Sequence, residues 1–290
     1  LQLAAAAGTT ADRVAVHTIH QHDTPAADYS TEEIIKTVGL GGFMFDPVFA
    51  KQAIRSVAKA AKESLADARP ATHVGLGSGE VKKVASNRRI LGANGRVKIV
   101  RFSASRNPAA LAAPEGVIDP QVRLVSFWNG GQPLASITHY ATHPQSYYGH
   151  GDVNPDFPGM ARAMMEEDVP AAAHIHFAGA GGNVGAGKYN NGSPTNRPIL
   201  AERLGRGMKL AWNTQKLTPI TAGDVAWNFT PVSLPVRDTI SEDSRSQVLF
   251  NEKEKDRTRV FAARDLAFLR RTKAGRKIDI GCLRIGKARI

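Results

Sequence analysis

The chain has 290 residues, of which 42% are hydrophobic and 22% are charged, a balance that excludes an intrinsically disordered protein. No apolar stretch approaches the ~20 residues that a membrane-spanning helix needs. The single cysteine, Cys282, excludes an internal disulfide bond and a cysteine-based zinc site, and the formal net charge of +12 raises the question of an anionic partner.

Hydrophobic periodicity and capping residues divide the chain into strands and helices. The first predicted elements are a strand over 13–19, a short helix opened by a capping box at Ser30-Thr-Glu-Glu33, and a long helix from Asp46-Pro47 to about residue 68. Strands over 72–77, 97–102, 122–127 and 135–140 follow, and then come a helix after Pro158, a strand over 171–177 and a helix over 197–213. The last predicted elements are strands within 220–236, a helix over about 244–271 and a strand over 278–290. The apolar face predicted for the long helix contains Val48, Phe49, Ile54, Val57, Ala61 and Leu65.

This alternation predicts an α/β (or α+β) fold, with large mixed β-sheets flanked by helices and a site at the strand ends. No linker divides the chain, so we expect a single domain over residues 1–290. The chain has no initiator methionine and ends within a predicted strand, so we expect a fragment truncated at both ends. It contains no recognisable signal segment.

The positive charge is concentrated near the C-terminus. Residues 252–290 contain 13 Lys and Arg against 5 Asp and Glu. A basic run beside a helical pattern is typical of a solvated helix face, and no nucleic-acid-binding motif accompanies it, so we expect no nucleic-acid partner. The alternative is a basic module that binds anionic polymers or membranes with an affinity that falls steeply with salt.

Eight of the nine histidines fall in three short clusters, each at or just past the end of a predicted strand. The clusters are His17, His20 and His22, then His139, His143 and His150, then His174 and His176. Open α/β sheets place their ligands at such strand ends, and imidazole is a common zinc ligand. Each histidine taken alone is also compatible with a hydrogen-bonded structural role.

Two of these clusters have spacings that suit a metal. In an extended chain His20 and His22 point to one side, whereas His17 points to the other and is expected to pack locally. His143 precedes Pro144, which favours an extended backbone and a fixed side-chain direction. His150 lies in a glycine-containing loop, where an ordinary surface role is the simpler interpretation.

Two other motif matches are incomplete. Gly182-Asn-Val-Gly-Ala-Gly-Lys188 nearly fits a phosphate-binding loop, but Tyr189 stands where the magnesium-binding hydroxyl is required and no helix follows directly. His20-Gln-His-Asp23 is similar to the first metal motif of metallo-β-lactamase-like hydrolases, but Pro25 replaces the histidine of the second metal. Neither match supports an assignment.

Six short segments occur in a characteristic order. They are His20-x-His22 with a following proline, Ser86-Asn-Arg-Arg89, Ile118-Asp-Pro-Gln-Val122, Tyr140-Ala-Thr-His-Pro144, Asn154-Pro-Asp-Phe-Pro-Gly159 and Phe177-Ala-Gly-Ala-Gly-Gly-Asn-Val184. Their order and spacing resemble the N-terminal catalytic domain of the neutral/alkaline (non-lysosomal) ceramidase family, especially its divergent bacterial relatives. The resemblance extends from about residue 6 to residue 290.

The resemblance implies a role for each matching residue. His20 and His143 match zinc-binding histidines, and His22 matches a histidine beside the metal. Arg88 matches an arginine that contacts the substrate, so His22 and Arg88 are the catalytic candidates. Asp156 and Gly159 match a segment that is expected to position the helix that follows.

Two departures from the family pattern bear on the activity. Gly185 stands where the family has a serine implicated in catalysis, and Asn183 replaces an aspartate; we expect this segment to contact the substrate. The family's remaining zinc ligands, a Glu and a Tyr, are expected beyond residue 290, unless Asp23 or Asp156 substitutes for them.

The resemblance therefore implies a zinc-dependent hydrolase of linear amide bonds, with a small-molecule or lipid amide as substrate. It also implies peripheral membrane contact and no defined protein partner. Export to the periplasm or the outside of the cell is expected on the same ground. The glycine at position 185 leaves the substrate open, and the fragment itself is not expected to be active. A non-catalytic relative that binds lipid or glycan, or another metal-dependent hydrolase, is the alternative.

Overall fold

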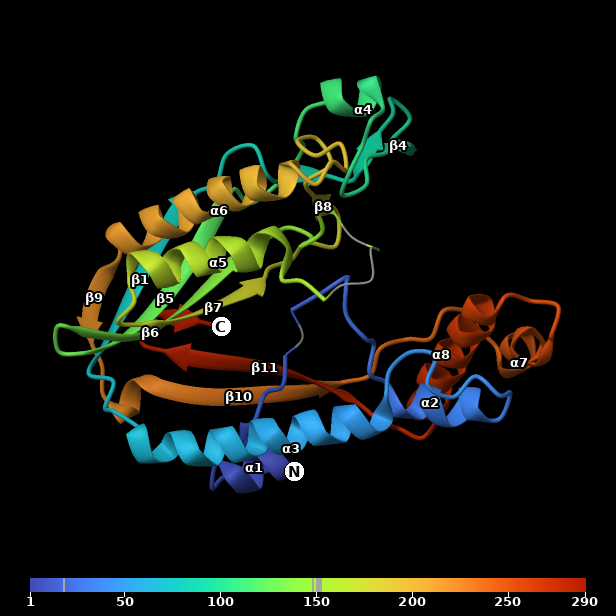
Figure 1. Ribbon diagram of the computed structural model, residues 1–290, viewed down its shortest axis with the longest axis horizontal. Coiled ribbons are helices and arrows are strands. Elements are labelled where there is room, and N and C mark those ends of the chain that lie inside the picture. The colour runs from blue at the N-terminus through green and yellow to red at the C-terminus, as the bar shows by residue number, and fades with distance from the viewer. Residues whose placement is uncertain (18, 148, 150–152) are drawn as a thin grey trace.

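The computed structural model describes residues 1–17, 19–147, 149 and 153–290. Its largest sheet has five strands in the order β7-β6-β5-β1-β9 (Figure 1). These strands are β1 (His73–Glu80), β5 (Gln121–Asn129), β6 (Gln132–Tyr140), β7 (Ala173–Ala178) and β9 (Lys216–Pro219). Neighbouring strands are antiparallel except β6 and β7, which are parallel. The predicted α/β class with a mixed sheet flanked by helices is confirmed.

One face of this sheet is covered by two long helices, α5 (Asp156–Asp168) and α6 (Asn196–Asn213) (Figure 1). The largest core cluster lies between them and the sheet, and it includes Val122 and Leu124 of β5, Phe157 of α5, and Leu204 and Met208 of α6. Because β6 and β7 are parallel, their carboxyl ends lie at the same edge of the sheet. The loops that follow these two strands therefore meet there.

Alternate glycines in β1 allow the backbone of α6 to lie directly on the strand. A Cβ atom added at Gly77 would be 2.0 Å from the carbonyl oxygen of Ala211, and one added at Gly79 would be 2.1 Å from that of Gly207. Both distances are shorter than any real contact, so no side chain fits without moving the helix. The spacing of these glycines sets the distance between the helix layer and the sheet.

We therefore expect Gly79→Ala to lower the free energy of unfolding by about 1–3 kcal/mol, because the added methyl group overpacks the interface between β1 and α6. Gly131→Ala is the matched control, since a Cβ atom there meets nothing within 4 Å. Urea unfolding followed by circular dichroism would measure both variants. Equal stability of the two variants would contradict the close helix–strand contact.

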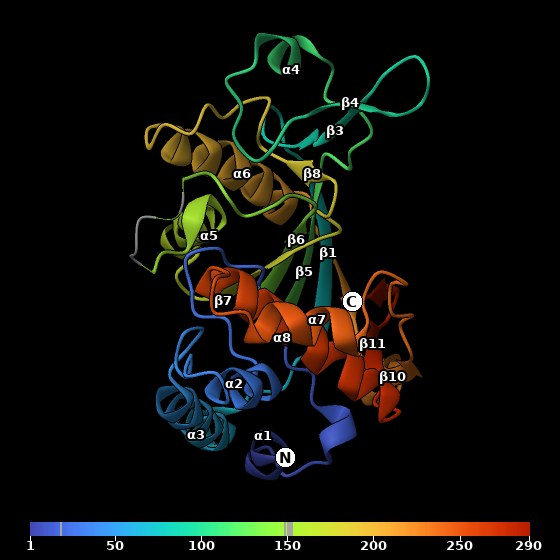
Figure 2. The same cartoon turned by 90° about the vertical axis from the view of Figure 1, so that its right-hand side faces the viewer.

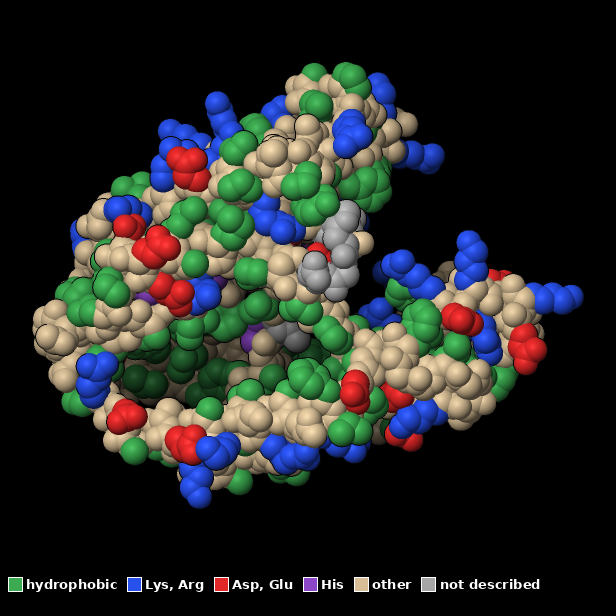
Figure 3. All heavy atoms as spheres, viewed as in Figure 1, with side chains coloured by type: hydrophobic (Ala, Val, Ile, Leu, Met, Phe, Trp, Pro, Cys, Tyr) green, Lys and Arg blue, Asp and Glu red, His purple; other side chains and the backbone are tan. Residues whose placement is uncertain are grey.

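The opposite face of the sheet packs against a three-stranded antiparallel sheet of β10 (Val225–Val232), β11 (Ile278–Ile285) and β12 (Ala288–Arg289). Val74, Val125, Ile285 and Ala288 form the buried cluster between the two sheets. Figure 3 shows a hollow, lined largely by hydrophobic side chains, between the layer of the five-stranded sheet and the layer that contains β10 and the long helix α3.

A separate helical cluster lies at one end of the molecule, where α2 (Tyr29–Lys36) packs beside α8 (Asp256–Lys273) (Figure 2). The N-cap of α2 is Asp28, whose carboxylate accepts from the backbone N–H groups of Ser30 and Thr31, so the predicted helix begins earlier than the Ser30 capping box implied. The single helix predicted over 244–271 is two helices, because α7 (Glu242–Phe250) ends before α8 begins and both contribute to one buried cluster.

The long predicted helix is confirmed as α3 (Pro47–Ser64), and the Asp46 side chain caps its first turn. None of the residues of α3 is buried, so its apolar face does not enter a core. The short helix α1 (Gln2–Ala6) lies against it. The 3-10 turns η1 (Ala11–Arg13), η2 (Leu65–Asp67) and η3 (Ala222–Asp224) complete this side of the fold.

On the side of the molecule away from α3 and α1, a small irregular lobe contains β3 (Arg89–Leu91), β4 (Val97–Val100) and α4 (Pro108–Ala112) (Figure 1). Two short strands, β2 (Ser86–Asn87) and β8 (Val184–Gly185), pair with one another and connect this lobe to the edge of the large sheet where β6 and β7 end. This connection brings the segments around residues 88, 143 and 184 together.

The strand predicted over residues 13–19 is wrong for its described residues. After η1 the chain is irregular, and Val16 is 78% exposed. The β-branched pattern gives local preference, but the described residues of this segment pair with no strand. No helix among the described residues is long and apolar enough to cross a membrane.

Candidate metal centre

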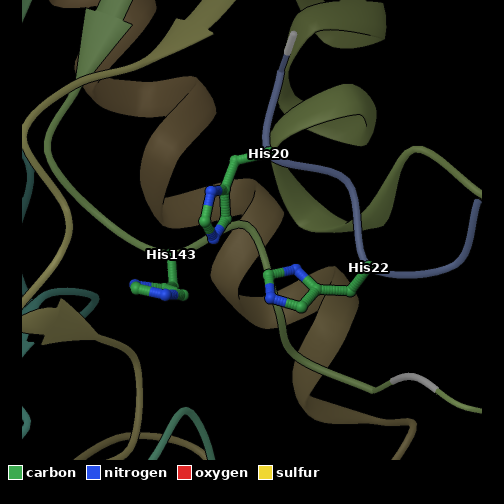
Figure 4. Close-up of side chains that lie close together, drawn as sticks. All are labelled: His20, His22 and His143. Carbon is green, nitrogen blue, oxygen red and sulfur yellow. The ribbon is translucent and has the colours of Figure 1, made fainter. Parts of the chain in front are cut away.

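Three histidines converge at the edge of the sheet where β6 and β7 end. One ligand atom from each of His20, His22 and His143 lies within 4.8 Å of the others. The ring centroids are 5.0 Å apart for His20 and His22, 4.7 Å for His20 and His143, and 5.8 Å for His22 and His143. Figure 4 shows the three rings turned toward one shared space. This is the only such group of metal-binding side chains among the residues that the structure describes.

The segment that carries His20 and His22 is held in place at several points. The indole of Trp227 in β10 donates to the carbonyl of Asp12, and His17 packs its ring on Phe177 of β7 at 4.8 Å. His17 was predicted to pack locally, and it packs instead on a strand that is distant in the sequence. Further along, Gln21 donates to the carbonyl of Asn154. These tertiary contacts, rather than a strand, place the histidines at the sheet edge.

His20 reaches the centre through an unusual backbone conformation. Its φ is 56°, one of three positive values among the described non-glycine residues. The left-handed region is disfavoured for side chains with a Cβ, and such strain gathers at functional sites. The parity argument for two histidines on an extended chain is therefore wrong in its geometry, although His20 and His22 do lie together.

The orientation of His143 is fixed by the loop after β7. Its Nδ1 atom lies 2.7 Å from the carbonyl oxygen of Gly181 and 3.0 Å from that of Val184. Carbonyl oxygens only accept, so Nδ1 carries the proton and Nε2 presents its lone pair. Proteins commonly orient a metal-binding imidazole in this way, by a hydrogen bond from the ring nitrogen that does not bind the metal.

A guanidinium group faces the same lone pair. Arg88 Nη1 lies 3.1 Å from His143 Nε2, and the guanidinium packs over the ring of Phe102 at 5.7 Å. The backbone fixes Arg88 on both sides, because its N–H donates to the carbonyl of Asn183 and its carbonyl accepts from the N–H of Arg101. A positive charge at the centre attracts anionic groups and opposes a second cation.

The electrostatics of the cluster keep two of its imidazoles neutral. Partial burial lowers the pKa of His20 and His22, and the nearby His143 lowers the pKa of both further. A smaller opposing effect on His22 comes from a hydrogen bond to Pro144 and from the charge of Asp156. Metal binding requires neutral imidazole, so these shifts extend the pH range in which the ligands are available.

Neither acidic side chain considered as a substitute ligand belongs to the cluster. Asp23 accepts from the backbone N–H of Gly149 and from the side chain of Asn154. Asp156 is buried, accepts from the backbone and hydroxyl of Ser146, and lies 3.7 Å from Arg197. It also begins α5, which agrees with the predicted helix-positioning role. The centre defined by the described residues is therefore built from imidazoles.

The two predicted substrate-contact residues, Asn183 and Gly185, both lie next to Arg88. The side-chain oxygen of Asn183 accepts from the backbone and guanidinium of Arg89 and so anchors the neighbouring arginine. Gly185 is buried in β8, and a Cβ atom added there would lie 3.4 Å from Ser103 Oγ and 3.7 Å from Arg88 Cγ. A substrate contact by either residue stays a prediction.

The glycine-rich run after β7 supports His143 instead of a phosphate. A Cβ atom at Gly181 would lie 2.9 Å from the backbone of Thr142, so only glycine allows this carbonyl to approach the imidazole. Lys188 donates to the carbonyls of Leu111 and Ala113. The role of Gly181 was not predicted from the sequence, although the glycine-rich pattern was its signal.

The other described histidines have structural partners. His174 is buried between the Ser136 hydroxyl and the Val169 carbonyl. His176 pairs with the Thr138 hydroxyl, and burial lowers its pKa to about 4. His139 stacks on Phe177, and His150 lies outside the described residues. The third histidine cluster therefore belongs to the interior of the sheet.

No protein-family model and no curated protein sequence matches the chain. Solved structures that are similar to it include a crystal structure of neutral ceramidase from Pseudomonas aeruginosa, with a TM-score of 0.49 and 18% identity over 81% of this chain and 42% of that chain. Another is a ceramidase complexed with C2, with a TM-score of 0.46 and 21% identity over 64% of this chain and 29% of that chain. The chain thus spans less than half the length of these ceramidases.

Proposed function

We propose that the chain carries the zinc centre of a hydrolase that cleaves linear amide bonds, of the neutral ceramidase type, with an N-acylated lipid or small molecule as substrate. The observation that supports this most is the convergence of His20, His22 and His143, with the Nε2 lone pair of His143 directed by the bonds of Nδ1 to backbone carbonyls. Export from the cell and peripheral membrane contact are parts of the same proposal.

The residues present fit a divalent ion. Imidazole nitrogens lie about 2.0–2.1 Å from zinc, which places two ligands of a tetrahedral site about 3.4 Å apart. The three imidazole ligand atoms already lie within 4.8 Å of one another, and His20 is exposed and has room to move. His20 and His143 would hold the ion, and the guanidinium of Arg88 would have to release the Nε2 atom of His143.

The chemistry follows from the charges of the centre. Zinc supplies a Lewis acid that lowers the pKa of water toward ~7 and polarises an amide carbonyl. His22 is neutral at neutral pH, so it can take a proton from the attacking water and return it to the leaving nitrogen. Arg88 can donate to the oxygen that gains negative charge. None of these roles needs a side chain at position 185.

Zinc stoichiometry tests the proposal. The full-length protein is expected to bind one zinc ion, and His20→Ala and His143→Ala are each expected to weaken binding at least ~100-fold, since loss of even an outer partner of a ligand costs 10–100-fold. In the same full-length protein, His22→Ala should retain the ion and lose the hydrolysis of N-acyl amide substrates. Elemental analysis after dialysis, and calorimetric titration, would measure binding.

His17→Ala is the matched control, because His17 lies on the same segment but packs on Phe177. Retention of stoichiometric zinc by both the His20 and the His143 variants would refute the ligand assignment. A wild-type full-length protein that binds no zinc would instead favour the non-catalytic relative that binds lipid or glycan.

A further inference from the structure

Helix α3 exposes apolar side chains that no core accounts for. It runs for 18 residues along the edge of the molecule without a single buried residue (Figure 1). Phe49 is 64% exposed, Val57 is 57% exposed and Ile54 is 42% exposed. A helix of this length normally buries one face, since tertiary packing supplies most of the stability of helices in proteins.

The residues of α3 are separated into two continuous faces. At about 100° per residue, one half of the helix circumference carries Phe49, Ala50, Ala53, Ile54, Val57, Ala58, Ala60 and Ala61, and Ser64 is its one hydroxyl residue. Beside it runs a basic stripe of Lys51, Arg55, Lys59 and Lys62, interrupted by Val48. This combination is typical of helices that lie in the plane of a membrane surface.

The neighbour of α3 enlarges the apolar surface and leaves it open. Helix α1 contacts one side of α3, and a groove of about 640 Å³ lies between them. Its walls are mostly aliphatic, from Leu3, Val14 and Ile54, while Lys51 and Arg55 also line it. An apolar floor with basic side chains beside it matches the acyl chain and the phosphate of a phospholipid.

The charges of α3 are available for such a partner. Lys59 pairs with Glu63 at 2.6 Å, but Lys51, Arg55 and Lys62 form no ion pair with any acid in the described part of the chain. At the C-terminal end of α8, by comparison, Arg270 pairs with Glu242 and Arg271 with Asp28. Three of the four basic side chains of α3 therefore carry a charge that no ion pair neutralises within the described part of the chain. Figure 3 shows Lys and Arg side chains along the lower edge of the molecule, where α3 runs.

We propose that α3 docks this protein on the surface of an anionic phospholipid bilayer, with the Phe49 and Val57 face in the acyl boundary and the basic stripe against the phosphates. Lipid fits better than a protein groove, because a basic stripe runs along one side of the apolar face and complements a uniformly negative surface. The docking does not depend on the zinc centre.

Vesicle co-sedimentation in the presence of EDTA tests the docking separately from the metal. The wild-type chain is expected to bind vesicles of 70% phosphatidylcholine and 30% phosphatidylglycerol at least ~10-fold more tightly than pure phosphatidylcholine at 50 mM NaCl, and to lose this preference at 300 mM. Lys51→Glu/Lys62→Glu should weaken binding at least ~25-fold, since each surface charge is worth about fivefold. Phe49→Ser/Val57→Ser should weaken it ~10-fold or more.

The controls repeat these changes elsewhere. Arg96→Glu/Lys98→Glu makes the same charge change around the β3–β4 hairpin at the opposite end of the molecule, and Phe250→Ser removes a 60% exposed ring from α7. Both should keep wild-type binding. All variants change exposed residues, and circular dichroism would confirm that they fold.

Three results would overturn the proposal. The first is equal binding to neutral and anionic vesicles, or none to either. The second is an equal loss of binding in the hairpin control. The third is a wild-type dimer that Phe49→Ser/Val57→Ser converts to a monomer without vesicle binding, because a second copy would then cover the face.

Discussion

Arg101→Met is expected to lower the free energy of unfolding by about 3–5 kcal/mol, one of the largest single effects in this protein. The side chain of Arg101 is 1% exposed, and its guanidinium donates to five backbone carbonyls. The acceptors are Asn87 at 3.1 Å, Ala110 at 2.8 Å, Ala113 at 3.2 Å, Pro114 at 3.0 Å and Glu115 at 3.2 Å. Methionine fills similar space but removes these five hydrogen bonds, and of the acceptors Ala113 keeps its bond from Lys188.

Urea unfolding at pH 7 would measure this loss. Arg101→Lys keeps the charge but not the planar fork of donors, so it should recover only part of the stability. The exposed Arg96→Met is the control and should stay within about 0.5 kcal/mol of wild type. A loss below about 1 kcal/mol in Arg101→Met would mean that these hydrogen bonds are replaced by water.

Arg88→Met is expected to change metal affinity and turnover in opposite directions. Removing the guanidinium frees the Nε2 atom of His143 and removes a positive charge from the site, so zinc should bind about tenfold more tightly. In the full-length protein, the same variant should lower kcat for amide hydrolysis ~10²-fold or more, since it loses a donor to the developing negative charge. Calorimetric titration and steady-state kinetics would measure the two effects.

Arg89→Met is the matched control, because Arg89 is exposed and its side chain bonds to Asn183 instead of His143. It should change neither value by more than about twofold. Weaker zinc binding in Arg88→Met would show that the arginine supports the centre structurally, and an unchanged kcat would remove it from the proposed mechanism.

Elements with a strong local signal were predicted well from the sequence. Asp46 and Pro47 start α3 as expected, because an N-cap carboxylate and a first-turn proline act within a few residues. The strands β1, β5, β6 and β7 and the helix α6 were also predicted near their observed positions. The side chains of these elements are buried at regular intervals in the central sheet and its helix layer, and this burial produces a regular hydrophobic periodicity in the sequence.

Two predictions failed where the local signal depends on a distant partner. Residues 13–19 have strand propensity, but the described residues of this segment pair with no strand. Side-chain contacts hold the segment instead, from Trp227 of β10 to the carbonyl of Asp12 and from His17 to Phe177 of β7. The helix predicted over 244–271 breaks after α7, because folding back allows Leu249 and Leu266 to share one core with α2. The hydrophobic pattern within either segment does not indicate which distant residues it will contact.

For the candidate site, the sequence by itself determined the chemistry: the type and order of His20, His22, Arg88 and His143, and the glycine at position 185. Only the tertiary structure decided that the three imidazoles share one space, that Gly181 and Val184 direct His143, and that Arg88 faces its lone pair. The physical reason is that the side-chain type is fixed by the gene at each position, whereas a shared site depends on loops that meet only after the sheet has formed.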